Sequence, residues 1–401
     1  MHADLLQELE HAIWDARPHE LIDTVTDRIK TDLDVIDVEL LLVDYHMAFL
    51  VPIRPDFEPV RLDNTSAGHA FAAQQIVGEP LTPGPGDAHL LHVPLAVHGD
   101  RLGVLTVHLP GPPTETRLAA VTRVATVVAR ALTIADQHTD LFRRVRRRSR
   151  LTLAAEMQWE LLPGRACATD EFHLAGQLEP AYSVWGDNFD WSVSADRLTL
   201  TVTNGMGAGT EAAALTHLAI SALRNARRSG ADLVEQAALA DQTVYAQHRG
   251  TRHLATLLLD FELATGRVRT IDAGSPHMYR MRGNVTEMVH FEAQLPLGMF
   301  GDAQYTAEEF FVEPGDRLVV VSDGVHTAES PIGELYGAVA LMQTLRETRL
   351  QSPSEAVRTF IRHFLEYHEG DEPLDDAVVV CLDWTGKTSA GRTLNGGASP
   401  R

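Results

Sequence analysis

The feature that most constrains the fold is the segment at residues 181–209, AYSVWGDNFDWSVSADRLTLTVTNGMGAG. Apolar residues on both sides of the turn-like residues 194–196 predict a β-hairpin. If the turn centres on that tripeptide, antiparallel pairing brings Asp187 beside Thr203 and Asn204. We therefore expect oxygen-bearing side chains to meet at one end of a sheet.

Three glycines follow the second strand of this hairpin, at Gly205, Gly207 and Gly209. Without side chains, the backbone there can bend tightly and approach a bound ion or phosphate closely. A helix is expected to begin directly afterwards. The pattern indicates a binding site at a strand end.

Two later segments also place carboxylates at strand ends. The apolar strand at residues 317–321 leads to Ser322-Asp323-Gly324, and Asp375-Asp376 directly precedes the apolar residues 377–382. Such carboxylates suit Mg²⁺ or Mn²⁺, which prefer a few carboxylates and retained waters. Taken singly, each of these motifs is more often an ordinary turn.

The order of the motifs carries more information than any one of them. Over about residues 150–385 it resembles the SpoIIE-type branch of the metal-dependent (PPM, protein phosphatase 2C-like) serine/threonine phosphatases. The motifs that carry the resemblance are, in order, Gly186-Asp187-Asn188-Phe189-Asp190, Asn204-Gly205-Met206-Gly207-Ala208-Gly209, Ala273-Gly274-Ser275-Pro276, Leu295-Pro296-Leu297-Gly298, Ser322-Asp323-Gly324 and Asp375-Asp376-Ala377.

The resemblance implies a catalytic site with two Mg²⁺ or Mn²⁺ ions. In the resembled family these ions activate a bridging water that attacks phosphoserine or phosphothreonine, so no protein nucleophile is needed. The family pattern implies metal ligands at Asp187, Asp323 and Asp375 and at the carbonyl of Gly205, with Asp190 and Asp376 in support.

The sequence departs from the family pattern at Asn204, where an aspartate normally bridges both metals. An amide offers a neutral oxygen but removes one negative charge, so at least one metal should bind more weakly. Trp185, Ala208 and Ser275 are further departures, from a glycine and two histidines respectively.

Two functions from different classes are compatible with these residues. The first is a working phosphatase that acts on a small regulatory phosphoprotein, such as an anti-sigma-factor antagonist in partner-switching signalling. The second is a pseudophosphatase that binds a phosphoprotein or kinase without turnover. Metal titration separates them.

Composition limits the remaining possibilities. The chain has 401 residues, of which 44% are hydrophobic and 22% charged, as expected for two soluble domains. The net charge of −21 argues against nucleic acid as the main partner. We expect no membrane span, no signal peptide and a cytoplasmic location. The two cysteines, Cys167 and Cys381, are too few for a disulfide framework.

Residues 1–113 show two helical patterns followed by strands at residues 35–43 and 47–53 and a hairpin at residues 90–107. This succession resembles a GAF domain, which commonly serves as a sensor or dimerisation module. No ligand can be inferred, and a docking surface without a small ligand is equally compatible. The histidines of this region lack the spacing of a metal site; they are His46, His69, His89, His92 and His98.

Residues 114–162 predict a connector helix, about 70 Å long if unbroken, capped by Thr114. Its apolar stripe could pair with a second copy in a homodimer or fold back on its own domain. The basic residues 143–150 are interpreted as a solvated face or an intramolecular partner for carboxylates, rather than a nucleic-acid site. Residues 151–163 resemble the helix that, in this phosphatase branch, transmits the sensor's state.

The C-terminal part, residues 163–385, alternates helices with antiparallel hairpins, which predicts an α+β fold. The family resemblance implies a β-sandwich flanked by helices. Residues 386–401, rich in Gly, Ser and Thr, are expected to be disordered.

Overall fold

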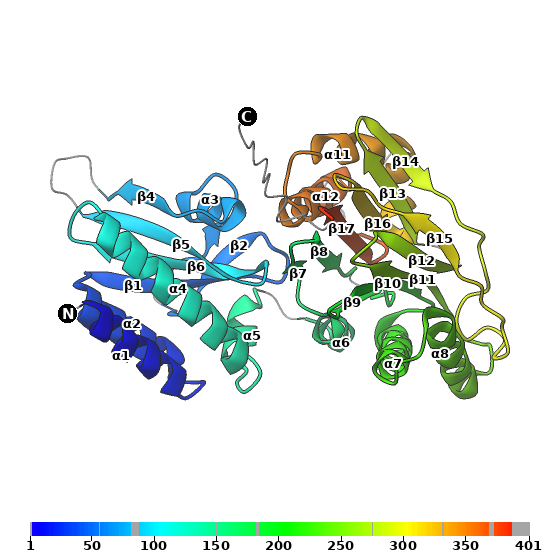
Figure 1. Cartoon of the computed structure of the whole chain (residues 1–401), viewed down its shortest axis with the longest axis horizontal. Helices are drawn as coiled ribbons and strands as arrows, with labels where there is room; N and C mark the ends of the chain where they lie inside the picture. Colours follow the sequence, from blue (N-terminus) through cyan, green and yellow to red (C-terminus); the bar gives the residue numbers. More distant parts are fainter. Residues whose placement is uncertain are drawn as a thin grey trace, which may run out of the picture. The chain divides into compact units, whose positions relative to one another are not determined.

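The computed structural model describes residues 2–55, 57–81, 88–148, 151–181, 184–274, 276–330, 333–368 and 373–386 (Figure 1). The chain divides into two compact units, Met1–Leu151 and Thr152–Arg401. The boundaries expected at residues 113, 162 and 385 stay predictions. The disorder expected for residues 386–401 falls, apart from Gly386, outside the described residues.

The N-terminal unit is built on a six-stranded antiparallel sheet with the order β3-β2-β1-β6-β5-β4. Its strands are β1 (Asp37–Val43), β2 (Phe49–Pro52), β3 (Val60–Arg61), β4 (Val77–Pro80), β5 (His89–Val97) and β6 (Asp100–Leu109). Its helices are α1 (His2–Asp15), α2 (Leu21–Leu33), α3 (Ser66–Ala73), α4 (Glu115–Ala135) and α5 (Leu141–Arg146).

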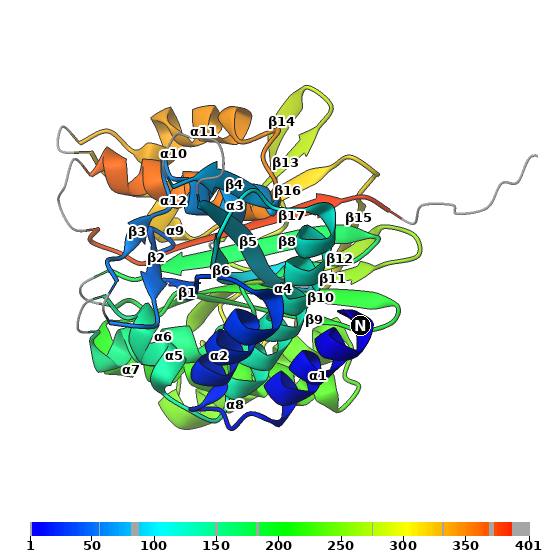
Figure 2. The same ribbon diagram turned by 90° about the vertical axis from the view of Figure 1, so that its left-hand side faces the viewer.

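Helices cover both faces of this sheet. Leu40 and Leu42 of β1 pack into a core with α1, α2 and α4, which lie side by side in Figure 2. Leu41 and Val43 point to the opposite face and pack with Phe71 of α3. Alternate strand residues thus serve two cores, as the period of a β-strand requires. The predicted α/β character of this unit is confirmed, and its GAF identity stays a prediction.

The region expected to form one connector helix is divided. α4 ends at Ala135, α5 spans Leu141–Arg146, and α6 spans Leu153–Leu161. Thr139 accepts a hydrogen bond from Leu141 N, and Thr152 accepts one from Ala155 N as the cap of a new helix. A continuous helix over residues 114–162 is therefore wrong, because threonine side chains take over the backbone donors at both interruptions.

The apolar stripe of α4 is used inside the N-terminal unit. Val121, Val124, Val128 and Leu132 are each at most 3% exposed and belong to the core beneath the sheet. The alternative in which the stripe folds back on its own domain is the one observed. These side chains are not available for a stalk with a second copy.

Among the described helices, α4 alone is long and apolar enough to cross a membrane by length and composition. The expectation that the chain has no membrane span stays a prediction. In this structure 56% of the apolar window is buried inside the protein. That burial is the behaviour of a core helix.

The C-terminal unit contains two antiparallel sheets with the orders β15-β12-β11-β10-β9 and β14-β13-β16-β17-β8-β7. The strands are β7 (Ala166–Ala168), β8 (Phe172–Glu179), β9 (Asn188–Val193), β10 (Arg197–Gly205), β11 (Leu254–Glu262), β12 (Arg267–Ala273), β13 (His277–Arg282), β14 (Val285–Val289), β15 (Glu308–Phe311), β16 (Arg317–Val321) and β17 (Ala377–Trp384). The helices besides α6 are α7 (Gly209–Arg228), α8 (Leu233–His248), α9 (Asp323–His326), α10 (Tyr336–Val339), α11 (Leu341–Glu347) and α12 (Pro353–Tyr367).

The two sheets pack face to face between layers of helices. Phe261 of β11 stacks on Trp384 of β17 with ring centroids 6.1 Å apart. Gly176 in β8 leaves room for the ring of Phe189 in β9, because an added Cβ would lie 2.7 Å from that ring. α7 and α8 cover the five-stranded sheet, and α11 and α12 cover the other (Figure 1). The predicted α+β sandwich is confirmed.

We predict that Leu132→Ala destabilises the N-terminal unit by about 2–5 kcal/mol, because it leaves a cavity in a closed core. The matched control is Ile134→Ala in the same helix, where the side chain is 50% exposed and the expected cost is below about 0.5 kcal/mol. Hydrogen exchange of β5 and β6 amides in the full-length chain reports the difference. Equal exchange in both variants would contradict the packing of α4.

Candidate metal centre

The predicted hairpin forms with the expected register. Asn188 pairs with Thr203 across β9 and β10, so the next step along the ladder places Asp187 opposite Asn204. Ser194 N donates to Arg197 O at 2.8 Å and closes the turn. Asp187 and Asn204 are both buried at the same end of the five-stranded sheet.

Close backbone packing explains the glycines at this end. The hydroxyl of Thr216 in α7 donates to Gly186 O at 2.5 Å. A Cβ added to Gly205 would lie 2.7 Å from that hydroxyl oxygen and 2.8 Å from Gly186 O. A side chain at Gly205 would therefore force the hairpin end and α7 apart.

The other sheet brings Asp323 and Asp375 together. Val321 pairs with Val379 on antiparallel β16 and β17, so Asp323 after one strand and Asp375 before the other lie at the same sheet edge. A Cβ added to Gly324 would overlap the Asp376 carbonyl and lie 3.2 Å from the Asp375 Cβ. Glycine is thus required for the two acidic segments to approach each other.

The carboxyl groups from these segments affect one another's ionisation. Burial raises the pKa of Asp187 well above its ordinary range, and the nearby charges of Asp376, Asp375 and Asp323 raise it further. Burial, with Asp323 as the next cause, raises the pKa of Asp375 to about 7. Acids from sequence-distant segments therefore form one electrostatic cluster.

Asp376 organises the segment that carries Asp187. It is fully buried and accepts hydrogen bonds from the backbone N–H groups of Ala181, Trp185 and Gly186 at 2.8–2.9 Å. Gln158 of α6 donates to its Oδ2 at 2.8 Å and to Asp187 O at 2.9 Å. Asp376 therefore supports the predicted metal ligand Asp187 by holding its backbone segment in place.

Sequence reasoning missed Gln158. The available signal was its position on the apolar face of the helix, because Gln158 lies three or four residues from Ala154, Ala155 and Leu161. Gln158 is only 1% exposed, whereas a polar residue on the solvent face of an amphipathic helix would be largely exposed.

Asp190 does not join the acidic cluster. Its carboxylate pairs with Arg224 at 2.8 Å and with Arg227 at 3.1 Å, which fastens α7 to β9. The expectation that Asp190 supports the metal ligands is corrected, because its charge is already compensated by two arginines. Ser275, the replaced histidine of the family motif, lies outside the described residues.

The donor set fits a hard divalent cation. Asp187 Oδ2 is buried without a hydrogen-bond partner, and the clustered carboxylates repel each other unless a cation or protons compensate them. Within the described ranges, no three His, Cys, Asp or Glu side chains already surround a common point closely enough to hold a metal ion.

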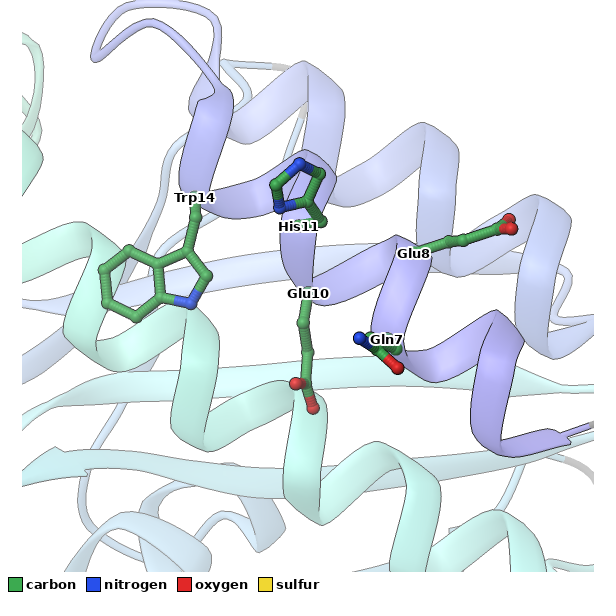
Figure 3. A pocket seen from close by; sticks show the side chains of 5 residues that line it. All are labelled: Gln7, Glu8, Glu10, His11 and Trp14. Atoms are coloured by element: carbon green, nitrogen blue, oxygen red, sulfur yellow. The ribbon is translucent and has the colours of Figure 1, made fainter.

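A shallow hollow of about 510 Å³ lies elsewhere, on the surface of α1 (Figure 3). All of its described lining residues come from one exposed helix face, and Glu10 points toward α4, where it pairs with Arg123. It contains none of the predicted site residues. Its lining residues are Gln7, Glu8, Glu10, His11 and Trp14.

Part of the C-terminal unit matches a known protein family. Residues 194–385 match the family model for Stage II sporulation protein E (SpoIIE), a range that includes Asn204, Asp323 and Asp375 and begins shortly after Asp187. Protein IcfG from Synechocystis sp. is 21% identical over 263 residues, which cover 59% of this chain. The chain spans 41% of the length of that relative.

Two solved structures are similar to this chain at low sequence identity. The RsbU and RsbW domains of Rv1364c from Mycobacterium tuberculosis are 20% identical and cover 54% of this chain and 61% of theirs, with a TM-score of 0.48. The PP2C phosphatase domain of SpoIIE from Bacillus subtilis, with a fragment of its regulatory domain, is 14% identical and covers 78% and 83%, also with a TM-score of 0.48.

The family match identifies the C-terminal part, over residues 194–385, as a phosphatase domain of the PPM class. Within that class it is a SpoIIE-type domain.

We predict opposite stability effects for two alanine substitutions. Asp376→Ala should cost about 3 kcal/mol, because it leaves several buried N–H donors without an acceptor. Asp323→Ala should leave metal-free stability unchanged or slightly higher, because it relieves repulsion among the acids. Chemical denaturation in chelator-containing buffer measures both. A clear loss for Asp323→Ala would make that residue a structural turn residue.

We also predict that metal-free stability falls as pH rises from about 4 to about 7. The pKa of Asp375 is raised from 3.8 to about 7, so the folded state binds more protons than the unfolded state in this window. Thermal unfolding at pH 5.5 and 7.5 in the presence of a chelator tests the sign. Asp375→Asn should flatten the dependence, and a wild-type stability that rises over this window would contradict the prediction.

Proposed function

We propose that the chain is a metal-dependent serine/threonine phosphoprotein phosphatase. The observation that carries this proposal is the cluster of Asp187, Asp323 and Asp375, brought from three distant segments to one end of the sandwich. Their mutual repulsion is the property that a divalent cation relieves. The SpoIIE-type domain supports the same reaction class.

The metal ligands we propose are Asp187, Asp323 and Asp375, the Asn204 side chain and the Gly205 carbonyl. Mg²⁺ or Mn²⁺ bound there would lower the pKa of a water and neutralise phosphoryl oxygens. The chain itself orients these groups. Asp376 and Gln158 fix the segment before β9, and the Thr216 hydroxyl fixes the turn at Gly186.

Asn204 weakens this centre in our proposal. A carboxylate attracts a dication several times more strongly than an amide at the same distance. One fewer negative charge near the other acids reduces repulsion in the metal-free state but also reduces metal affinity. We therefore expect turnover that needs high Mn²⁺.

Asn204 also favours the second candidate, a pseudophosphatase. In that case the same surface binds a phosphoprotein or partner kinase, and the chain does not hydrolyse it. Titration with Mn²⁺ separates the two functions, because only the phosphatase should bind two ions at accessible concentrations.

The substrate we propose is a small regulatory phosphoprotein of the anti-sigma-factor antagonist type, in the cytoplasm. The net charge of −21 favours a protein partner over nucleic acid. A homodimer stays a proposal, with the buried stripe of α4 no longer its interface. In the resembled branch the helix before the catalytic domain transmits the sensor's state, and Gln158 gives α6 a direct contact for that role.

We predict a large gain in Mn²⁺ affinity and turnover for Asn204→Asp, with the fold unchanged because the side chains are nearly isosteric. A bridging carboxylate should contribute a few kcal/mol, or about a hundredfold in metal affinity. Isothermal titration with Mn²⁺ and hydrolysis of a phosphoserine peptide measure the two effects.

The matched control is Asn225→Asp, the same change on the exposed surface of α7. Because Asn204-Gly205 is prone to deamidation, peptide mapping must show intact Asn204 in each wild-type preparation. Equal metal affinity and turnover for wild type and Asn204→Asp would mean that position 204 is not a metal ligand.

A further inference from the structure

The rim of the candidate centre contains an arginine that the proposed reaction has not used. Gly205 pairs with Leu254 on β10 and β11, so the chain before β11 passes beside the turn that follows Gly205. A Cβ added to Gly207 would overlap Nη1 of Arg252. The guanidinium therefore occupies the space above this glycine, three residues beyond Asn204.

Most N–H donors of the Arg252 guanidinium are not used in hydrogen bonds to described residues. Its Nη2 donates to Oε2 of Glu211 at 2.7 Å, in the first turn of α7. Within the described part of the chain this is its one hydrogen bond, although a guanidinium carries five N–H donors in a planar fork. Its side chain is 34% exposed, so a ligand in solvent can reach the remaining donors.

The ion pair with Glu211 is easily exchanged. The Glu211 side chain is 76% exposed, and a single-contact pair at such exposure contributes at most about 1 kcal/mol. A phosphate or carboxylate that engages two donors of an arginine binds more strongly than a single-contact partner. A ligand can therefore displace Glu211.

The segments around the candidate centre carry an excess of negative charge. The segments at residues 184–187, 205–209, 323–327 and 373–376 contain four aspartates and neither lysine nor arginine. An anionic ligand that approaches these carboxylates is repelled unless cations compensate. Arg252 places a permanent positive charge next to one of these segments.

Resting on the proposed function, we propose that Arg252 is a substrate-binding residue. Its guanidinium receives an oxyanion of the phosphoprotein substrate at the rim of the metal centre, and Glu211 holds it in the absence of substrate. The oxyanion is the phosphoryl group of the phosphoserine or a carboxylate beside it in the substrate. The two share the geometry that a guanidinium recognises.

The test is a double-mutant cycle in the full-length chain with Mn²⁺, using Arg252→Gln, Glu211→Gln and the double variant. Arg252→Gln should raise KM for a phosphoserine peptide about tenfold or more, with kcat changed less than about twofold. Glu211→Gln should lower KM by up to about fivefold, because the competing anion is gone. In the double variant the gain from Glu211→Gln should vanish.

Direct binding keeps the test independent of turnover. Anisotropy of a labelled phosphoserine peptide should show the same shifts in Kd. If wild type binds the peptide and does not hydrolyse it, the proposed activity fails while the role of Arg252 is still decided. If turnover is intact and neither KM nor Kd responds to Arg252→Gln, this inference alone is overturned.

Different substrates identify the oxyanion. A KM effect on p-nitrophenyl phosphate assigns Arg252 to the phosphoryl group, and an effect confined to peptides with acidic flanking residues assigns it to a substrate carboxylate. Arg252→Lys, which keeps the charge and loses the fork, should give an intermediate KM and guards against misfolding of the neutral variant.

A matched control is Glu287→Gln, which breaks the comparable pair with Arg280 on β13 and β14. It should change neither KM nor Kd. If Glu211→Gln still lowers KM in the Arg252→Gln background, the effect is one of general surface charge and the inference is wrong.

Discussion

Asp376 is a fully buried carboxylate whose contacts in the described part of the chain are N–H groups without positive charge. Hydrogen bonds from backbone amides can hold such a group in place of a cation. Because the donors come from residues 181–187 and from α6, this one side chain connects the end of β8, the start of β9 and the first helix of the C-terminal unit. The position of Asp187 depends on that arrangement.

The same arrangement makes the centre electrostatically unfavourable without ligands. Burial and neighbouring acids raise the pKa values of Asp187 and Asp375, so folding places groups together that would separate in water. Hairpin formation, strand pairing and apolar packing between the two sheets, such as that of Phe261 on Trp384, offset the repulsion among these acids. Apolar packing in the sandwich stabilises the fold. Repulsion among the acids at one end lowers the free energy of unfolding, as is common at binding sites.

Local sequence patterns predicted the parts of the site that depend on nearby residues. The turn at Ser194 and the alternation of its flanks fixed which residue faces Asn204, and the glycines after Asn204 and Asp323 marked the close approaches. Contacts between distant segments could not be predicted this way. Gln158 meets Asp376 across 218 positions, and no local pattern shows that pairing.

Helix continuity and partner choice were the least predictable features. The apolar stripe of α4 suits a second helix as well as its own sheet, because burial of apolar area is not directional. Asp190 resembled a site residue by position, and only the fold showed that Arg224 and Arg227 on the next helix compensate its charge. A carboxylate's role is set by whether a cation already neutralises it, which sequence alone does not state.

Two residues at the rim of the candidate centre reduce its negative charge. Asn204 lies on β10, and Arg252 lies just before the neighbouring strand β11. Asn204 makes the acidic end less negative because it lacks a carboxylate, and Arg252 does so because it adds a positive charge. For a dication both changes are unfavourable, because they reduce the attraction that gathers it. For a phosphorylated protein both are favourable, because they reduce repulsion of an anion. Under the proposed function, these two residues therefore favour binding of a phosphorylated substrate over binding of metal.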